Sequence, residues 1–222
     1  MTESQPYLPA ASGGLPAPPT MPREGRRERR AAETRIRLFR CALQLFAERG
    51  FPNVTVEDIT EAADVGKGTF FNYFVTKDHV LGVMAEIQLG KVREAASLAA
   101  QGKKPIRAVL HRFFLRIVEE PGRSPDLARA LISCFLANEG VRNLIRRAMA
   151  EGRGVVSQIV AAGQARGEID PRLKRERVAT QLLQTIMGTV LLWSLHGDPP
   201  LKAWIEDSFR HFWRSIAFSG KK

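Results

Sequence analysis

Apolar residues recur every three or four positions along most of the chain, which is the period of an amphipathic α-helix. Between residues 33 and 49 they form a wide stripe, and Gly50 is expected to end that helix. No segment carries the strict alternation that predicts a strand. The pattern therefore predicts an all-α fold of about nine helices.

Proline, glycine and capping residues mark where the later helices begin and end. A long helix is expected over residues 77–99. The predicted boundaries after it are Pro105 near a helix start, a break at Pro121-Gly122, a start at Ser124-Pro125, a stop at Gly140, a stop at Gly167, a start at Asp170-Pro171 and a separating loop at residues 197–200.

Residues 55–77 predict two short helices joined by a tight turn, which is the layout of a DNA-reading module. Thr55 and Asp58 have the spacing of a capping box, so the first helix is expected to begin directly after Thr55. Gly66 lies in the turn, where it takes a backbone angle or an N-cap position closed to larger residues. The second helix is expected over residues 67–74.

The exposed face of this second helix carries the candidates for base contacts. Lys67 and Thr69 are placed to reach a guanine edge or a thymine methyl group in the major groove, and Asn72 is a third candidate. Thr55 can donate to a phosphate at the N-terminus of the first helix, where backbone amides also point outward. The buried side of the pair is assigned to Ile59, Ala62, Ala63, Phe70 and Phe74.

The sequence VGKGTFFNYFVTKDHVL, preceded by RIRLFRCALQLFAERGFPNVTVEDITEAADV, resembles the N-terminal DNA-binding domain of the tetracycline-repressor (TetR) family over roughly residues 35–84. A helix ending in LFAERGF, a T-V-x-D-I start, a G-x-G-T-x-x-x-Y-F recognition helix and a following T-K-D occur in order. The resemblance implies an all-helical dimeric regulator, whose larger C-terminal domain binds a small effector and dimerises through its last two long helices.

Four positions take roles from this resemblance. Gly66 stands where the family usually has Ser or Thr capping the recognition helix and touching a phosphate. Phe71 stands where the family usually has Tyr. This replacement keeps the van der Waals contact to the DNA backbone but loses the hydrogen bond from the tyrosine hydroxyl to a phosphate. Tyr73 and Lys77 match phosphate-contacting positions; the alternatives are packing for Tyr73 and an ordinary surface charge for Lys77.

The net charge of +11 suits a polyanionic partner, but its distribution limits the argument. Residues 21–80 hold 11 Lys/Arg against 9 Asp/Glu, so most of the excess lies in residues 81–222, where solvated helix faces are the better explanation for part of it. The segment REGRRERR at residues 23–30 contains five arginines and is either a flexible arm for an adjacent minor groove or a basic helix extension.

Three regions follow from these patterns. Residues 1–30 form a tail with the basic arm, in which residues 1–22 are expected to be disordered because they lack a core-forming pattern. Residues 31–80 form a three-helix helix-turn-helix domain. Residues 81–222 form a helical ligand-binding and dimerisation domain.

The C-terminal region has enough apolar bulk to line an effector cavity, although core packing explains each residue equally well. The candidate lining residues are Phe113, Phe114, Ile117, Phe135, Met187 and Trp193. A dimer surface is expected on the helices at residues 172–195 and 202–218. Its candidates are Leu182, Leu183, Ile186, Val190, Trp204, Phe212 and Trp213.

Catalytic and membrane signatures are missing from the sequence. It has no HExxH or GxSxG motif, no phosphate-binding glycine loop and no Cys/His cluster at metal spacing, so neither an enzyme, a metal nor a cofactor is expected. Cys41 and Cys134 lie in helical patterns and are interpreted as small buried residues in a reducing cytoplasm. The longest apolar run, residues 185–195, is shorter than a membrane span of about 18 residues.

The resulting hypothesis is a cytoplasmic, homodimeric repressor that binds a near-palindromic double-stranded operator and releases it when a small effector binds. One alternative is a non-gated architectural DNA-binding protein without an effector. A second is an effector-binding or enzymatic module in which the helix-turn-helix is incidental.

Overall fold

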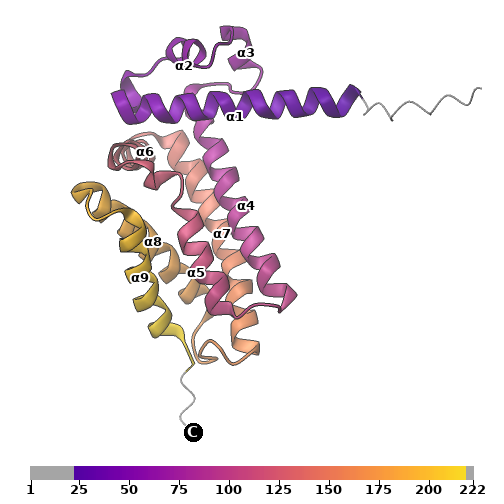
Figure 1. Ribbon diagram of the computed structural model, residues 1–222, viewed down its shortest axis with the longest axis vertical. Helices are drawn as coiled ribbons and strands as arrows, with labels where there is room; N and C mark the ends of the chain where they lie inside the picture. The colour runs from indigo at the N-terminus through magenta and orange to yellow at the C-terminus, as the bar shows by residue number, and fades with distance from the viewer. Residues whose placement is uncertain (1–22, 219–222) are drawn as a thin grey trace, which may run out of the picture. The chain divides into compact units, whose positions relative to one another are not determined.

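A computed structural model describes residues 23–218, which form nine α-helices and three short 3-10 helices without a strand (Figure 1). The predicted all-α fold is confirmed. The expectation for residues 1–22 lies outside the described residues. The α-helices are α1 Arg23–Arg49, α2 Val56–Ala62, α3 Lys67–Phe71, α4 Val80–Gln101, α5 Ile106–Ile117, α6 Pro125–Ala137, α7 Glu139–Ala165, α8 Arg175–His196 and α9 Leu201–Ile216; the 3-10 helices are η1 Phe51–Asn53, η2 Lys77–His79 and η3 Pro121–Arg123.

The chain divides into two compact units, Met1–Thr34 and Arg35–Lys222. In the first unit α1 already begins at Arg23, so the arginine-rich segment is a helix extension, which is one of the two expected forms. Within it, Nε of Arg29 donates to Oε1 of Glu33 at 3.0 Å, one helical turn apart.

Local capping chemistry sets most helix ends. The Ser124 hydroxyl accepts from the Leu127 amide at 3.1 Å and starts α6 as predicted. The predicted stop at Gly140 is wrong: the Asn138 side chain accepts from the Val141 amide at 2.9 Å, which places Gly140 inside the first turn of α7.

The predicted start of α8 at Asp170-Pro171 is also wrong. Oδ1 of Asp170 accepts from the Arg172 amide at 2.9 Å, which makes a local turn in place of an N-cap. The Asp170 carboxylate also pairs with the Arg172 guanidinium, and the hydrogen bond from that guanidinium lowers the pKa of Asp170. The helix therefore begins only at Arg175.

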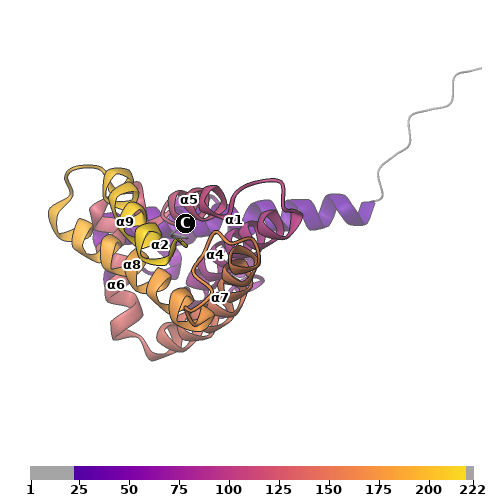
Figure 2. The same ribbon diagram turned by 90° about the horizontal axis from the view of Figure 1, so that it is seen from below.

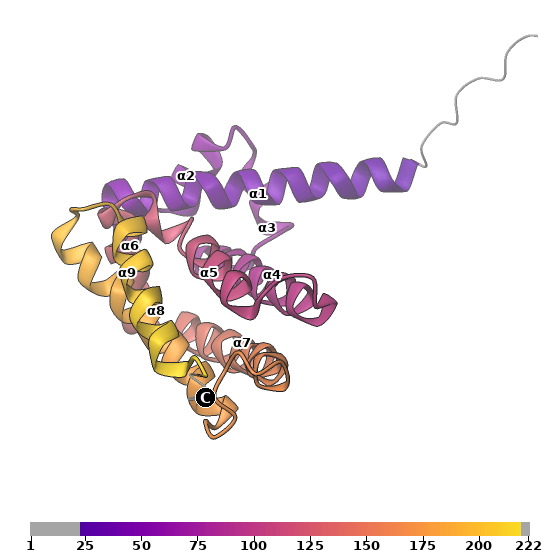
Figure 3. The same ribbon diagram turned by 60° about the horizontal axis from the view of Figure 1, so that its bottom comes forward.

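Helices α4 and α7 lie side by side, as Figures 1 and 2 show, and run in the same direction (Figure 1). A Cβ placed on Gly82 would lie 3.7 Å from the Leu144 side chain, and one placed on Gly152 would lie 3.8 Å from Leu89. Helices α8 and α9 form an antiparallel pair (Figure 3), in which the Thr189 and Ser208 hydroxyls are 2.8 Å apart.

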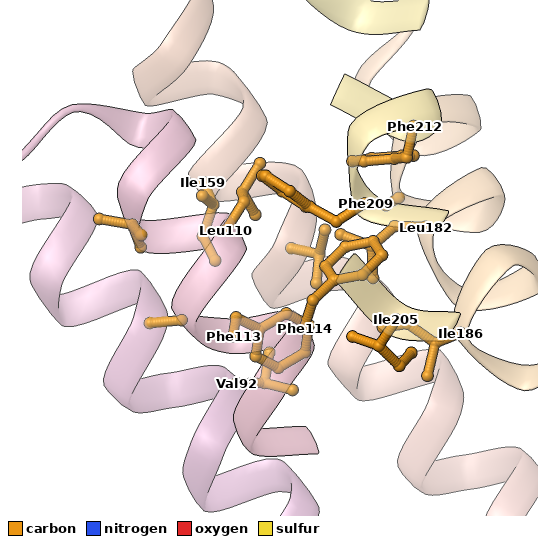
Figure 4. Packing of buried hydrophobic residues seen from close by; sticks show 14 of the residues in the cluster. Val92, Leu110, Phe113, Phe114, Ile159, Leu182, Ile186, Ile205, Phe209 and Phe212 are labelled. Atoms are coloured by element: carbon orange, nitrogen blue, oxygen red, sulfur yellow. The ribbon is translucent and has the colours of Figure 1, made fainter. Parts of the chain in front are cut away.

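Two hydrophobic clusters form the core of the second unit. In the first, Phe114 of α5 packs against Phe209 and Phe212 of α9, with ring centroids 5.1 and 5.3 Å apart (Figure 4). The second joins α1, α2 and α3 to the start of α4 and also contains Leu131 and Cys134 of α6. The helix-turn-helix therefore shares its core with the helices that follow it.

Helix α8 is long and apolar enough to cross a membrane by length and composition alone, although its longest apolar run had indicated otherwise. Its packing explains this composition, because α8 lies against α6, α7 and α9. Val178, Leu182 and Trp193 of α8 are buried in the first cluster.

Candidate nucleic-acid interface and ligand cavity

The capping box that starts α2 is confirmed. The Thr55 hydroxyl accepts from the Asp58 amide at 3.1 Å and donates to Oδ2 of Asp58 at 2.6 Å. This hydrogen bond from Thr55 lowers the pKa of the Asp58 carboxyl group. Because the Thr55 hydroxyl already donates within the box, the structure does not support its use as a phosphate donor, and the exposed backbone of the first turn is the better candidate.

The turn between α2 and α3 differs from the prediction. Gly66 caps α3 in an extended conformation, with φ of −71° and ψ of 152°, and a Cβ added there would meet nothing within 4 Å. The left-handed angle belongs to Asp64, with φ of 50°. Gly66 is therefore the N-cap of α3, which was one of its two predicted roles. The position is not closed to larger residues, which corrects the other part of the prediction. Ala62, expected to be buried, is exposed at the end of α2.

Helix α3 is shorter than predicted, because it ends at Phe71 where the Tyr73 amide bonds back to the Phe70 carbonyl over three residues. Phe70 is buried as expected, and its ring lies 5.3 Å from that of the buried Phe74. On the other side Phe71 and Asn72 are exposed, while Thr69 is half-buried. Lys67, Thr69 and Asn72 therefore come from a single short helix and its C-cap.

Lys67 is exposed at the first position of α3, and its ammonium pairs with the Glu57 carboxylate of α2. This hydrogen bond lowers the pKa of Glu57. The partner was not predicted from the sequence. A base contact by Lys67 must therefore compete with an ion pair inside the module.

Lys77 does not lie free on the surface. Its Nζ donates to the carbonyl oxygens of Phe51 and Val54, both at 2.8 Å, and lies 4.6 Å from the Phe51 ring centroid. These partners give Lys77 a structural role, and a phosphate contact by its ammonium would have to compete with them. Tyr73 is half-buried against the second cluster, in line with its packing alternative.

No pattern in the sequence indicates a role for Arg35, which links α1 to α4. Its guanidinium donates to both Glu86 carboxylate oxygens, at 2.7 and 2.8 Å, and lies 5.9 Å from the Phe74 ring centroid. Hydrogen bonding to Arg35 lowers the pKa of Glu86. The pair is 51 residues apart, so no local spacing signals it.

The largely apolar cavity of about 180 Å³ lies among α4 to α8. Four of the six predicted lining residues contribute to it, namely Phe113, Ile117, Phe135 and Met187. Phe114 and Trp193 do not. Phe114 turns to the other side of α5 and packs against α9, and the Trp193 indole donates to the Pro199 carbonyl at 3.1 Å.

The candidate dimer residues divide into three groups. Most are buried in the protomer's own core, which corrects their assignment to an interface; these are Leu182, Ile186, Val190 and Phe212. Leu183 lines the cavity, and Trp204 and Trp213 are half-buried. Exposed apolar residues are found instead at Leu191, Leu192 and Leu195 of α8.

Both cysteines are free thiols. Cys134 is buried as predicted, and burial raises the pKa of its thiol to about 12. Cys41 is only half-buried, and its Sγ lies 3.4 Å from the Ala62 carbonyl oxygen.

Comparison with known proteins agrees with this arrangement. The family model described as bacterial regulatory proteins, tetR family, matches residues 38–84 of the chain. A second family model, described as a tetracyclin repressor-like C-terminal domain, matches residues 136–209. The HTH-type transcriptional regulator TcmR of Streptomyces glaucescens is 30% identical over 191 residues, which cover 81% of each chain.

Two solved structures extend the comparison. Thermus thermophilus FadR, a TetR family transcriptional repressor in complex with lauroyl-CoA, is 29% identical with a TM-score of 0.57, over 80% of this chain and 92% of that one. The fatty acid degradation regulator FadR from Bacillus halodurans has a TM-score of 0.69 at 18% identity, over 84% and 98% of the two chains, and shares the fold.

Proposed function

We propose, for a chain that belongs to the tetR family of bacterial regulatory proteins, that it represses transcription as a homodimer and leaves its operator when a small apolar effector fills the cavity. Residues 31–80 bind the DNA, and residues 81–222 bind the effector and form the dimer contact. The protein is a helix-turn-helix transcriptional regulator, and its place of action is the bacterial cytoplasm.

One observation carries the proposed coupling: α4 belongs to both the helix-turn-helix core and the cavity wall. Val80 and Leu81 at its start are buried in the cluster that holds α2 and α3 in place. Leu89 and Val92, two to three turns later, line the cavity. A ligand that moves the wall therefore moves a helix packed against the DNA-reading module.

The energetic condition on such an effector is explicit. It must bind the conformation with DNA-incompetent spacing of the two heads more tightly than the competent one, because equal affinity shifts no population. Changing the ratio of the two forms from 1:99 to 99:1 requires a difference in affinity of about 10⁴-fold.

On the DNA side, the exposed edge of α3 supports direct readout of the major groove. Lys67 and Thr69 are the proposed base readers, with Asn72 in a supporting position. The open N-cap at Gly66 leaves the first backbone amides of α3 accessible to a phosphate.

The dimer supplies specificity, since one head reads only a few base pairs and two heads at fixed spacing match a two-fold site. The proposed contact is the exposed apolar face on the second half of α8. Leu192 is 51% exposed and Leu195 is 64% exposed. They lie about one turn apart on one helix face.

Selection of bound genomic fragments by the purified protein, followed by sequencing, tests the proposal at the DNA level. Recovery of one near-palindromic sequence is expected. Lys67→Ala and Thr69→Ala should each weaken operator binding by about 1–3 kcal/mol and relax the preference at one or two base pairs. Equal losses on operator and random DNA would remove both residues from the set of base readers.

The observations favour the proposed function over its two alternatives. A non-gated architectural protein gives no role to the cavity on α4, and it predicts salt-dependent but sequence-indifferent binding. An enzymatic module predicts turnover of the bound small molecule, whereas TcmR and the FadR of Thermus thermophilus are transcriptional regulators.

A further inference from the structure

We propose that the cavity takes a neutral, apolar molecule about the size of one substituted ring, bearing a hydroxyl group that donates a hydrogen bond to Oε1 of Gln88. This deepens the proposed function, because it names the chemical class of the effector. It is drawn from the polar groups and the size of the cavity.

Gln88 of α4 is fixed by its amide nitrogen. Nε2 donates to the Ile117 carbonyl oxygen at 3.0 Å and lies 3.5 Å from Oε2 of Glu120. Both neighbours are acceptors, so the nitrogen must face them and the oxygen must face away. The orientation of the amide thus follows from its surroundings.

The amide oxygen of Gln88 is buried and accepts no hydrogen bond from any group in the described part of the chain. An unpaired buried acceptor costs about 1–3 kcal/mol, which a bound donor recovers. Among the described residues, only Gln88 and Arg153 bring polar side chains to a wall that is otherwise apolar. A ligand with one hydroxyl group on an apolar body matches that wall.

The charges immediately beside Gln88 favour a neutral group over an anion at Oε1, whereas Arg153 is the one charged side chain in the described lining that would favour an anion, which the comparison with hexanoate tests. The Glu120 carboxylate lies next to the amide and is shared with the ammonium of the buried Lys91. That ammonium is also 3.2 Å from Glu119 and donates to the Arg116 carbonyl, so its hydrogen bonds are used. An anionic ligand group next to Oε1 would be repelled by the lone pairs of that oxygen and by the Glu120 carboxylate beside the amide.

The cavity volume limits the size of the ligand. A cavity of about 150 Å³ is known to hold benzene, so 180 Å³ holds one ring with a short alkyl substituent. Larger ligands, for which pockets of about 300–1,000 Å³ are usual, would require the helices to separate.

Calorimetric titration with 4-ethylphenol and 4-ethylanisole at pH 7 tests the inference, because the two probes differ in the hydroxyl donor. The unmodified protein is expected to bind the phenol about tenfold more tightly. In Gln88→Met, which keeps the side-chain length but removes the acceptor, the two affinities should come within about twofold.

Gln164→Met is the matched control. Nε2 of Gln164 also donates to backbone carbonyls, those of Asp170 and Leu173 at 3.1 and 2.8 Å, but Gln164 lies outside the cavity lining. This variant loses comparable hydrogen bonds and should keep the preference for the phenol. Comparing two ligands within each variant separates recognition from any change in stability.

Several outcomes would overturn the inference: no binding of either probe, equal affinities in the unmodified protein, an unchanged ratio in Gln88→Met, or tighter binding of hexanoate than of the phenol. Failure of the proposed function looks different. In that case the phenol binds through Gln88, but operator affinity in a filter-binding assay does not change.

Discussion

Nζ of Lys77 lies 2.8 Å from the carbonyl oxygen of Val54, 23 residues earlier in the chain. The same ammonium bonds the Phe51 carbonyl, also at 2.8 Å, so the start of η2 holds the loop that leads into α2. A residue that resembles a phosphate contact is thus part of the internal support of the DNA-reading module.

Lys77→Met should lower the free energy of unfolding by about 2 kcal/mol, because it removes charged donors from half-buried carbonyls while keeping the stem over Phe51. Urea unfolding measures this change. The salt dependence of operator binding should stay the same, whereas a lost phosphate contact would lower its slope by about one unit. Lys202→Met, at an exposed lysine on α9, is the control and should be neutral.

Gly66→Ser should raise the free energy of unfolding by about 0.5 kcal/mol, since a serine hydroxyl caps α3 and the unfolded chain loses flexibility. Gly167→Ser is the matched control, because a Cβ there also meets nothing within 4 Å, but φ is +68°. That variant should be destabilised by about 1 kcal/mol. Thermal unfolding of both variants tests the contrast; equal effects would contradict the assigned backbone conformations.

Glu57→Gln should raise DNA affinity by about two- to fivefold, because it releases the Lys67 ammonium from an exposed ion pair. Glu61→Gln removes the same charge from the same helix without touching that pair. Filter binding on operator DNA compares the two variants. An equal gain in both would show a general charge effect and not the release of Lys67.

The Arg35–Glu86 pair predicts a pH dependence of stability. Because the pKa of Glu86 is lowered in the folded protein, the pair contributes fully above the unfolded pKa of about 4.3, and the contribution is lost as the pH falls through the folded value. Urea unfolding of the unmodified protein and Glu86→Gln should differ by a constant amount above about pH 5.5. The difference should shrink below pH 4.3; a constant difference down to pH 3 would rule out the pair as its source.

Leu192→Glu should give a folded helical monomer with at least tenfold weaker operator binding, because a buried charge is costly at an apolar contact between protomers. Leu136→Glu is the control: Leu136 is 70% exposed but lies on α6. This second variant should remain dimeric in sedimentation experiments. Persistence of the dimer in Leu192→Glu would place the interface elsewhere.

Sequence reasoning succeeded where the cause is local. The capping box of Thr55 and Asp58, the cap at Ser124 and the helix end at Gly50 all depend on residues within four positions of one another. The buried pair Phe70 and Phe74 followed from helical spacing. These features needed no knowledge of the rest of the chain.

Features that depend on distant neighbours could not be predicted in this way. Phe113 and Phe114 are adjacent and chemically identical, yet Phe113 lines the cavity and Phe114 packs on α9. The tertiary packing of α5 determines which of its faces meets which helix. The Lys77 and Arg35 contacts join residues 23 to 51 positions apart. The start of α7 was not predicted, because Gly140 was expected to stop a helix, whereas the Asn138 cap places it in the first turn.

The α8–α9 pair has an optical consequence. The chain has three tryptophans, and all of them lie on these two helices: Trp193, Trp204 and Trp213. The DNA-reading helices contain none, so intrinsic tryptophan emission arises entirely from the hairpin next to the cavity. Tryptophan fluorescence excited at 295 nm therefore reports on the region around the cavity without a contribution from the DNA-reading helices, and it requires no attached dye.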